Sequence, residues 1–341
     1  MHPNKKPKLL IGITMGDPCG IGPEIIVRAL ASASLKRAAN YLILGNQEVL
    51  DRTIKSLKIP LHYKTISDDS SIEDITSPLS LLSTEYFTPA LIKKRGPTKE
   101  GGALSFLWIE KGIHLALQGK INALVTAPIS KEAIHMAGHN YPGHTEILCD
   151  LSRVKRVVML MVGGTLRVAF VTTHIALKEI PHSITVKNVL ETITISNDYL
   201  KKYFNIKNPR IAVCGVNPHA GEEGIFGNEE EKIIAPAVKK ARNLVITCDG
   251  PVSADTVFYK ALKGTYDLVV SMYHDQGAIP LKLHAFEIGV NITLGIPFIR
   301  TSPDHGTAYD IAGKGIANPE SMKEAIKMAI MMAQGGKKVL K

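Results

Sequence analysis

The chain has 341 residues, which is enough for two domains or for one large α/β unit. A hydrophobic content of 45% against 21% charged residues excludes a disordered chain, because so many apolar side chains support a sizeable core. The net charge of +10 suits anionic small molecules, but the scattered basic residues without interleaved aromatics argue against nucleic acid as a partner.

The four cysteines lie far apart, without a C-x-x-C pair, which argues against a disulfide framework or a zinc ribbon and suits a reducing compartment. The apolar stretch 9–14 is too short for a secretory signal, and the longest apolar run, 157–166, contains two glycines and is too short to span a bilayer. We therefore expect a cytoplasmic protein without a membrane partner.

Short runs rich in Val, Ile and Leu alternate with longer amphipathic stretches. The short runs predict β-strands at 8–14, 41–44, 123–126, 157–162, 167–172, 210–216, 267–272 and 290–294. The amphipathic stretches predict helices at 98–118, 185–204, 229–242 and 320–334, and the polar segment 67–80 is predicted to be a loop. This alternation is typical of an α/β fold with mostly parallel sheets covered on both faces.

Polar or glycine-rich clusters follow nearly every predicted strand, beginning at Thr14, Thr126, Thr172, Val216 and Met272. Ligands of open α/β sheets bind outside the carboxyl ends of the strands, so these clusters are candidates for one shared site. The first cluster continues as Gly-Ile-Gly-Pro-Glu at 20–24, with a proline suited to the first turn of a helix. Its spacing matches neither a Rossmann nor a P-loop motif, so a plain strand-to-helix turn stays open.

A second group of residues is suited to binding an anion. His144 and Thr145 lie where a helix is predicted to begin, and helix N-termini attract phosphate. Lys282, Asn291 and Arg300 follow at spacings of nine, and lysine and arginine are the usual pair for holding phosphate. The alternative for each is a surface cation or a turn asparagine.

Three histidines, His174, His219 and His274, occupy equivalent positions after predicted strands. Together they could converge on one divalent metal and leave coordination positions open for a substrate. Imidazole ligands favour zinc, cobalt or nickel over magnesium, although a mixed set that includes the carboxylate of Asp255 would weaken that preference. The alternatives are histidines in ordinary structural hydrogen bonds and an aspartate that caps a helix.

The segment 305–319 combines glycines, alanines, an aspartate and an asparagine in one predicted loop. Glycines let the backbone approach a flat ring or a ribose closely, since no Cβ intervenes. Asp310 can accept hydrogen bonds from ribose hydroxyls and would repel a 2′-phosphate. From the residues alone, a glycine-rich turn between a strand and a helix stays open.

Taken together, these motifs resemble the 4-hydroxythreonine-4-phosphate dehydrogenase family, within the isocitrate and isopropylmalate dehydrogenase superfamily. The resemblance is carried by 14–24, 142–146, 172–177, 217–222, 273–282 and 290–319. It implies two α/β/α domains with mostly parallel sheets and an active-site cleft between them. We expect a first domain of 1–134 plus 275–341, with the NAD adenosine loop, and a second of 135–274, with the metal ligands and dimer contacts.

The resemblance also implies a role for each candidate residue. His174, His219 and His274 would bind the metal, zinc or alternatively cobalt or magnesium, and with Asp255 would form the catalytic group. The substrate contacts would be His144, Thr145, Lys282, Asn291 and Arg300. The NAD adenosine site would comprise His305, Gly306, Thr307, Ala308, Asp310 and Asn318, because the pair Asp310-Ile311 goes with NAD rather than NADP in that superfamily. The general base stays open among Asp255, a histidine and a metal-linked water.

The implied reaction is an NAD- and metal-dependent oxidation of the 3-hydroxyl of 4-phosphohydroxy-L-threonine, followed by decarboxylation to 3-amino-2-oxopropyl phosphate, in pyridoxal phosphate biosynthesis. The implied assembly is a homodimer with its active site at the subunit interface. The alternatives are a 4-phospho-D-threonate or 4-phosphoerythronate 3-dehydrogenase and a non-catalytic sugar-phosphate-binding protein. Relatives acting on aromatic cis-diols also exist, and a phosphoryl transferase is disfavoured because no nucleotide phosphate loop is present.

Overall fold

The computed structural model describes residues 8–66, 72, 75–84 and 95–335, and contacts divide it into two compact units. The first contains the chain up to Lys155 together with Ile296–Gln334, and the second contains Arg156–Gly295. Both borders fall later in the chain than the expected 134/135 and 274/275. The reason is packing, because α6 (His144–Leu151) contacts α4 (Lys99–Leu117), whereas α11 (His274–Ala285) packs on strands of the second unit.

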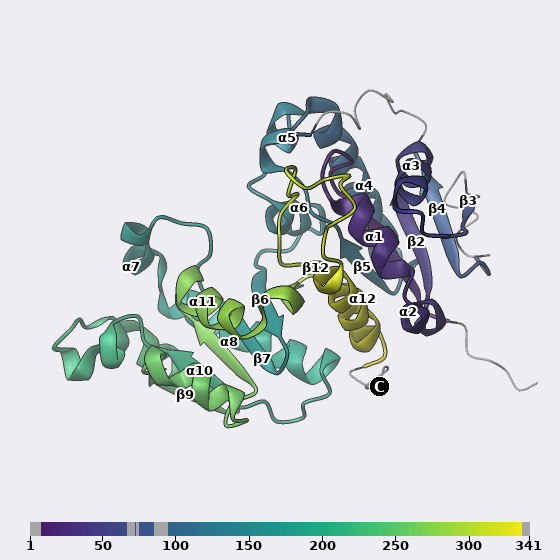
Figure 1. Ribbon diagram of the computed structural model, residues 1–341. Coiled ribbons are helices and arrows are strands. Elements are labelled where there is room, and N and C mark those ends of the chain that lie inside the picture. The colour runs from purple at the N-terminus through teal and green to yellow at the C-terminus, as the bar shows by residue number, and fades with distance from the viewer. Residues whose placement is uncertain (1–7, 67–71, 73–74, 85–94, 336–341) are drawn as a thin grey trace, which may run out of the picture. The chain divides into compact units, whose positions relative to one another are not determined.

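The first unit is built on a sheet in the order β3-β4-β2-β1-β5-β12, in which every described pair is parallel (Figure 1). Its strands are β1 (Leu10–Thr14), β2 (Asn40–Gly45), β3 (Lys64–Ile66), β4 (Leu79–Ser83), β5 (Ala123–Thr126) and β12 (Arg300–Pro303). Its other helices are α1 (Gly22–Leu30), α2 (Ala33–Ala38), α3 (Gln47–Leu57), α5 (Lys131–Met136) and α12 (Glu320–Ala333).

Helices cover both faces of this first sheet. A Cβ added at Gly112 of α4 would meet the side chain of Leu124, whereas the hydroxyl of Thr301 donates to the Ala325 carbonyl of α12. Thr301 pairs with Val125, the neighbour of Leu124, and successive strand residues point to opposite faces. The parallel strands are therefore buried on both sides, as their continuous apolar runs predict.

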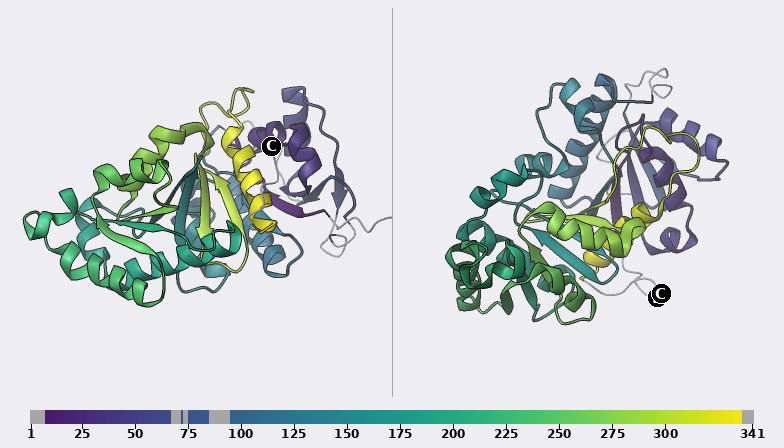
Figure 2. Two further views of the ribbon diagram at one scale, coloured as in Figure 1. Left: turned by 90° about the horizontal axis from the view of Figure 1, so that it is seen from below. Right: turned by 60° about the vertical axis from the view of Figure 1, so that its left-hand side comes forward.

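The second unit has a mixed sheet in the order β11-β6-β7-β10-β8-β9. Figure 2 shows the ribbon of this unit in teal and green. Strands β6 (Val158–Gly163), β7 (Leu166–Phe170) and β11 (Val290–Leu294) are linked by antiparallel pairing, whereas β7, β10 (Leu268–Ser271), β8 (Ile211–Cys214) and β9 (Cys248–Val252) pair in parallel. The helical segments are η3 (Leu177–Glu179), α7 (Ile180–Ser183), α8 (Val186–Tyr203), η4 (Pro218–Gly224), η5 (Glu230–Ile234), α9 (Ala235–Asn243), α10 (Ala254–Leu262), α11 and η6 (Phe286–Ile288).

One apolar core joins α10 and α11 to the same face of the second sheet. Phe258 of α10 and Leu281 of α11 belong to a single buried cluster with Val168, Val269 and Ala212, which are register partners on three neighbouring strands. This packing fixes the start of α11, and with it His274, at the carboxyl edge of the sheet.

The predicted α/β class and all eight predicted strands are confirmed, and 123–126 and 290–294 agree at both ends. The predicted helices at 98–118, 185–204 and 320–334 are confirmed as α4, α8 and α12, while 229–242 opens with the π-helical turn η5 before α9. The predicted loop 67–80 is wrong at its end, because Leu79 and Ser80 lie in β4; residues 67–71, 73 and 74 lie outside the described part.

Strands β3, β4, β9 and β12 were not predicted. β12 reads Arg-Thr-Ser-Pro and is buried throughout, so its residue types indicate a polar loop although it lies within the sheet. β9 contains a Gly-Pro pair, which is more typical of turns. No helix of the described residues is long and apolar enough to cross a membrane.

Candidate active site

In the first unit the end of β5, the start of β12 and the start of α6 bring Thr126, Arg300 and His144 together. Helix α6 begins at His144 after Gly143, as predicted. Arg300 is only 2% exposed, and its Nη2 and Nε donate hydrogen bonds to the Thr126 hydroxyl at 2.6 and 3.2 Å. Thr126, which begins one of the predicted strand-end clusters but was given no role of its own, therefore orients the guanidinium.

Burial and the nearby charge of Arg300 keep His144 neutral. Its Nε2 is buried and has no hydrogen-bond partner among the described residues. Burial, and then the positive charge of Arg300, hold the pKa of His144 well below its usual value. Burial also lowers the pKa of Arg300 to about 9.

A buried cation beside an unsatisfied ring nitrogen is suited to an anionic ligand. A bound phosphate or carboxylate would give His144 Nε2 the hydrogen-bond partner that it lacks and would place a negative charge near Arg300. Thr145, the second residue of α6, is half-buried next to them. The structure therefore brings two of the predicted substrate residues, His144 and Arg300, together within one unit.

The other two predicted substrate residues lie in the second unit. Asn291 is on β11, opposite Met161 of β6, and its Oδ1 is buried without a hydrogen-bond partner among the described residues. Lys282 is half-buried on α11, with its ammonium 6.0 Å from the centroid of the Phe286 ring. A buried amide oxygen without a donor is a second feature expected of a polar binding surface.

Two of the three predicted metal ligands are neighbours at the carboxyl edge of the second sheet. His174 follows β7 and His274 opens α11 after β10, and their ring centroids are 5.6 Å apart. His274 Nδ1 lies 2.7 Å from the Asp275 carboxylate, which orients the ring and leaves Nε2 as its potential ligand atom.

The third histidine lies in a different loop. His219 is in η4, after β8, with its Nδ1 3.9 Å from the Asp255 carboxylate at the start of α10. Within the described residues no three His, Cys, Asp or Glu side chains are gathered closely enough to hold a metal ion. The structure thus presents two pairs, His174 with His274 and His219 with Asp255, whose imidazole and carboxylate donors suit a borderline divalent cation.

The predicted adenosine residues lie on the loop between β12 and α12. His305, Gly306 and Asp310 are exposed, while Thr307 and Ala308 are half-buried. Asn318 accepts a hydrogen bond from the Glu320 backbone amide at 3.0 Å, which forms a turn immediately before α12. The loop turns through left-handed conformations at Ala308, Gly313 and Gly315, and the glycines adopt them without a steric penalty.

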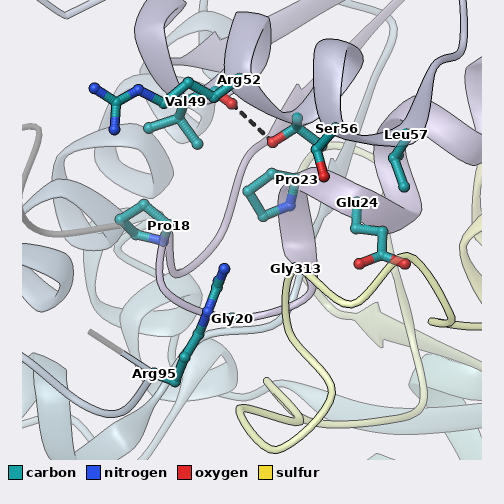
Figure 3. Close-up of a pocket in the computed structure, with 11 residues that line it drawn as sticks. Pro18, Gly20, Pro23, Glu24, Val49, Arg52, Ser56, Leu57, Arg95 and Gly313 are labelled. Atoms are coloured by element: carbon teal, nitrogen blue, oxygen red, sulfur yellow. Dashed lines mark hydrogen bonds between the residues drawn. The ribbon is translucent and has the colours of Figure 1, made fainter. Parts of the chain in front are cut away.

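The segment between β1 and α1 contacts this loop through residues that sequence reasoning missed. Asp17 accepts a hydrogen bond from the Tyr309 hydroxyl at 2.6 Å, and burial raises the pKa of Asp17. Glu24 is turned toward the loop (Figure 3) and accepts a bond from the Ala317 backbone amide at 2.9 Å. Both residues belong to the Gly-Asp-Pro and Gly-Pro-Glu motif that follows β1. The spacing of this motif does not predict that it contacts the loop between β12 and α12.

A small cavity of about 130 Å³ lies beside this contact, lined by residues of α1, α3 and the loop (Figure 3). Arg95 reaches into it next to Gly313, where an added Cβ would collide with the guanidinium. Gly313 thus allows close approach of a cation to the loop backbone.

Comparison with known proteins gives consistent matches. A family model described as "Pyridoxal phosphate biosynthetic protein PdxA" matches residues 37–329. The chain is 48% identical over 332 residues to a 4-hydroxythreonine-4-phosphate dehydrogenase of Geobacter metallireducens, covering 97% of each protein. It is 44% identical to a D-threonate 4-phosphate dehydrogenase of Salmonella typhimurium, covering 95% of this chain and 98% of that protein. A solved 4-hydroxythreonine-4-phosphate dehydrogenase of Klebsiella pneumoniae is 42% identical with a TM-score of 0.85, covering 96% and 100%.

Proposed function

The chain belongs to the PdxA family of pyridoxal phosphate biosynthetic proteins, and on that premise we propose that it oxidises the 3-hydroxyl of 4-phosphohydroxy-L-threonine. NAD⁺ and a divalent metal would be its cofactors. The resulting 3-oxo acid is a β-keto carboxylate, which loses CO₂ to give 3-amino-2-oxopropyl phosphate. The observation that supports this most strongly is the buried pairing of Arg300 with an unsatisfied His144, which suits a phosphorylated, carboxylated substrate.

His144, Thr145 and Arg300 would bind an anionic group of the substrate. Because His144 is neutral, its Nε2–H tautomer can donate a hydrogen bond without a further positive charge, while Arg300 supplies the charge. Lys282 on α11 and Asn291 on β11 are the other two proposed substrate contacts. The anchored phosphate fixes the distance to C3, which helps to align its hydrogen for transfer.

His174, His219 and His274 would hold the metal, which we propose to be zinc, with cobalt or magnesium as alternatives. When bound, such a cation lowers the pKa of a coordinated hydroxyl and polarises a carbonyl. Asp275 keeps the His274 ring oriented, and Asp255 lies beside His219, where it can accept a proton or position a histidine. These residues belong to loops at one edge of a single sheet, which is the usual location for catalytic groups in this class of fold.

The loop between β12 and α12 would bind the adenosine half of NAD⁺, which supplies the hydride acceptor. The exposed Asp310 carboxylate would accept hydrogen bonds from the ribose hydroxyls and would disfavour NADP by repelling its 2′-phosphate. His305, Gly306, Thr307 and Ala308 would contact the same half of the cofactor. Asn318 would also contact this half of the cofactor, and its hydrogen bond from Glu320 holds the turn that leads into α12.

D-threonate 4-phosphate is a second candidate substrate, because a protein named for that activity is 44% identical to this chain. Both substrates carry a terminal phosphate, a 3-hydroxyl and a carboxylate, and they differ at C2. The residues described above bind the shared groups, so they support both activities equally.

The test is NADH formation from each substrate in a side-by-side assay at 340 nm. We expect turnover of 4-phosphohydroxy-L-threonine that EDTA abolishes and a divalent metal restores, because the metal activates the hydroxyl. A kcat/KM more than about tenfold higher for D-threonate 4-phosphate would instead assign the second activity. Absence of NADH with both substrates in the metal-loaded protein would refute the proposed function.

A variant pair assigns the metal to the proposed ligands. His219→Ala is expected to lose bound metal while remaining folded, because its ring is exposed. His182→Ala, in α7 of the same unit, is the matched control and should keep its metal. If His219→Ala binds as much metal as His182→Ala, His219 is not a metal ligand.

A further inference from the structure

Ala308 has a left-handed backbone conformation, with φ of 42°, in the middle of the loop between β12 and α12. This region is unfavourable for a residue with a Cβ, because the Cβ approaches the following carbonyl oxygen. Alanine has no polar side chain to stabilise the conformation locally. Contacts on either side of Ala308 must therefore hold the backbone in place.

Both neighbours of Ala308 are held by the segment that follows β1. The Ile21 backbone amide donates to the Thr307 carbonyl at 2.9 Å. The Tyr309 hydroxyl donates to Asp17 Oδ2 at 2.6 Å. Asp17 is completely buried, and its other oxygen accepts a bond from the Cys19 backbone amide at 2.8 Å, so its carboxylate cannot follow a moving loop.

The far half of the loop has its own anchor. Glu24, which is 3% exposed, accepts bonds from the backbone amides of Ala317 at 2.9 Å and Gly315 at 3.3 Å, and Arg28 donates to the Gly315 carbonyl. Loss of the Tyr309 hydroxyl would therefore loosen the stretch that follows Ala308, while Thr307 keeps its bond to Ile21 and the end that enters α12 keeps its bonds to Glu24.

We propose that the Asp17–Tyr309 hydrogen bond positions the loop for the dinucleotide. It holds Ala308 in its left-handed conformation and so directs the exposed carboxylate of Asp310, the residue after Tyr309, toward the ribose. Asp17 and Tyr309 are positioning residues that act through the backbone of the loop. The inference rests on the proposed function, because it takes NAD⁺ as the ligand of this loop.

The experiment compares Tyr309→Phe with wild type in the metal-loaded full-length protein. We expect KM and Kd for NAD⁺ to rise about tenfold, as for the loss of one charge-assisted hydrogen bond. The KM for the phosphorylated substrate and kcat at saturating NAD⁺ should stay within about twofold, because the loss affects the binding of one ligand only.

Tyr41→Phe is the matched control, since the Tyr41 hydroxyl makes a bond of similar length, 2.7 Å, to the Leu35 carbonyl in the same unit. It should lower Tm without changing the KM for NAD⁺. Asp17→Asn keeps an oxygen that can accept from Tyr309, so its KM for NAD⁺ should rise less than that of Asp17→Ala.

The outcomes separate this inference from the function on which it rests. If wild type reduces NAD⁺ and Tyr309→Phe has an unchanged KM and Kd for NAD⁺, the positioning role is wrong and the proposed function stands. If wild type neither binds nor reduces NAD⁺, both are wrong. A rise in KM that Tyr41→Phe reproduces would show a general loss of stability and would also overturn the positioning role.

Discussion

His144 shows how burial decides the chemistry of a single residue. Its sequence position only places it at a helix start, whereas its protonation state depends on burial and then on the charge of Arg300, 156 positions further along the chain. Because the folded state lowers the pKa of His144, the unfolded chain takes up a proton more readily as the pH falls below about 6.5. Protonation of this residue therefore favours unfolding in acid and has no effect above that range.

The lowered pKa of His144 makes the free energy of unfolding fall as the pH falls. Between pH 6.5 and 5, His144 should reduce the free energy of unfolding by up to about 1.4 kcal/mol per pH unit. His144→Gln should therefore lose less stability than wild type between pH 7.5 and 5.5, as measured by urea unfolding. His62→Gln, which changes an exposed histidine of the same unit, should lose as much as wild type. Equal losses in all three proteins would contradict the buried, neutral state of His144.

At the scale of elements, α4 and α5 pack with almost no space between them. A Cβ added at Gly102 of α4 would lie 1.9 Å from the Ala133 carbonyl oxygen of α5. The sequence indicates the helix but gives no reason for a glycine near its start, where alanine has the higher helix propensity. The reason is the neighbouring helix.

Gly102→Ala should therefore lower the free energy of unfolding by about 1–3 kcal/mol, because the steric overlap exceeds the gain of about 1 kcal/mol in helix propensity. Gly96→Ala is the control, since a Cβ there would meet nothing within 4 Å. Thermal and urea denaturation measure both changes. A Gly102→Ala protein as stable as wild type would mean that α4 and α5 separate at no cost.

Elements with periodic apolar residues were predictable, and those without them were not. α8 begins after Thr185, whose hydroxyl caps the Asn188 amide, and both signals are local. β12 has no apolar residue before its proline, and its burial comes from pairing with β5 and covering by α12. Strand formation there depends on neighbours distant in sequence, so no local pattern indicates it.

At the scale of the whole molecule, α11 and the turn after it expose a row of apolar side chains. Ile279, Leu283 and Phe286 are 63%, 88% and 77% exposed, at helical spacings of four and three. The same helix carries His274 and Lys282, which are proposed to bind the metal and the substrate. We propose that a second copy of the chain covers this row and buries it next to the proposed site, in the homodimer that the family resemblance implies.

Leu283→Lys should therefore weaken the dimer, because it places a charge among side chains that association would bury. Size-exclusion chromatography with light scattering at micromolar concentration should show a shift toward monomer and a matching loss of NADH formation. Val245→Lys is the matched control, because Val245 is also 88% exposed in the same unit. Dimers of unchanged stability in Leu283→Lys would exclude this face as the interface.

The sequence by itself determined the α/β class, most of the elements and the residue types at the strand ends, because apolar periodicity and capping are local properties. It also predicted that His144 and Arg300 bind an anion, which stays a prediction. Only the tertiary structure decided that Thr126 orients Arg300 and that Asp17 and Glu24 hold the C-terminal loop. These contacts join segments far apart in the chain. Their geometry depends on the order of the strands in the sheet, which no local sequence pattern encodes.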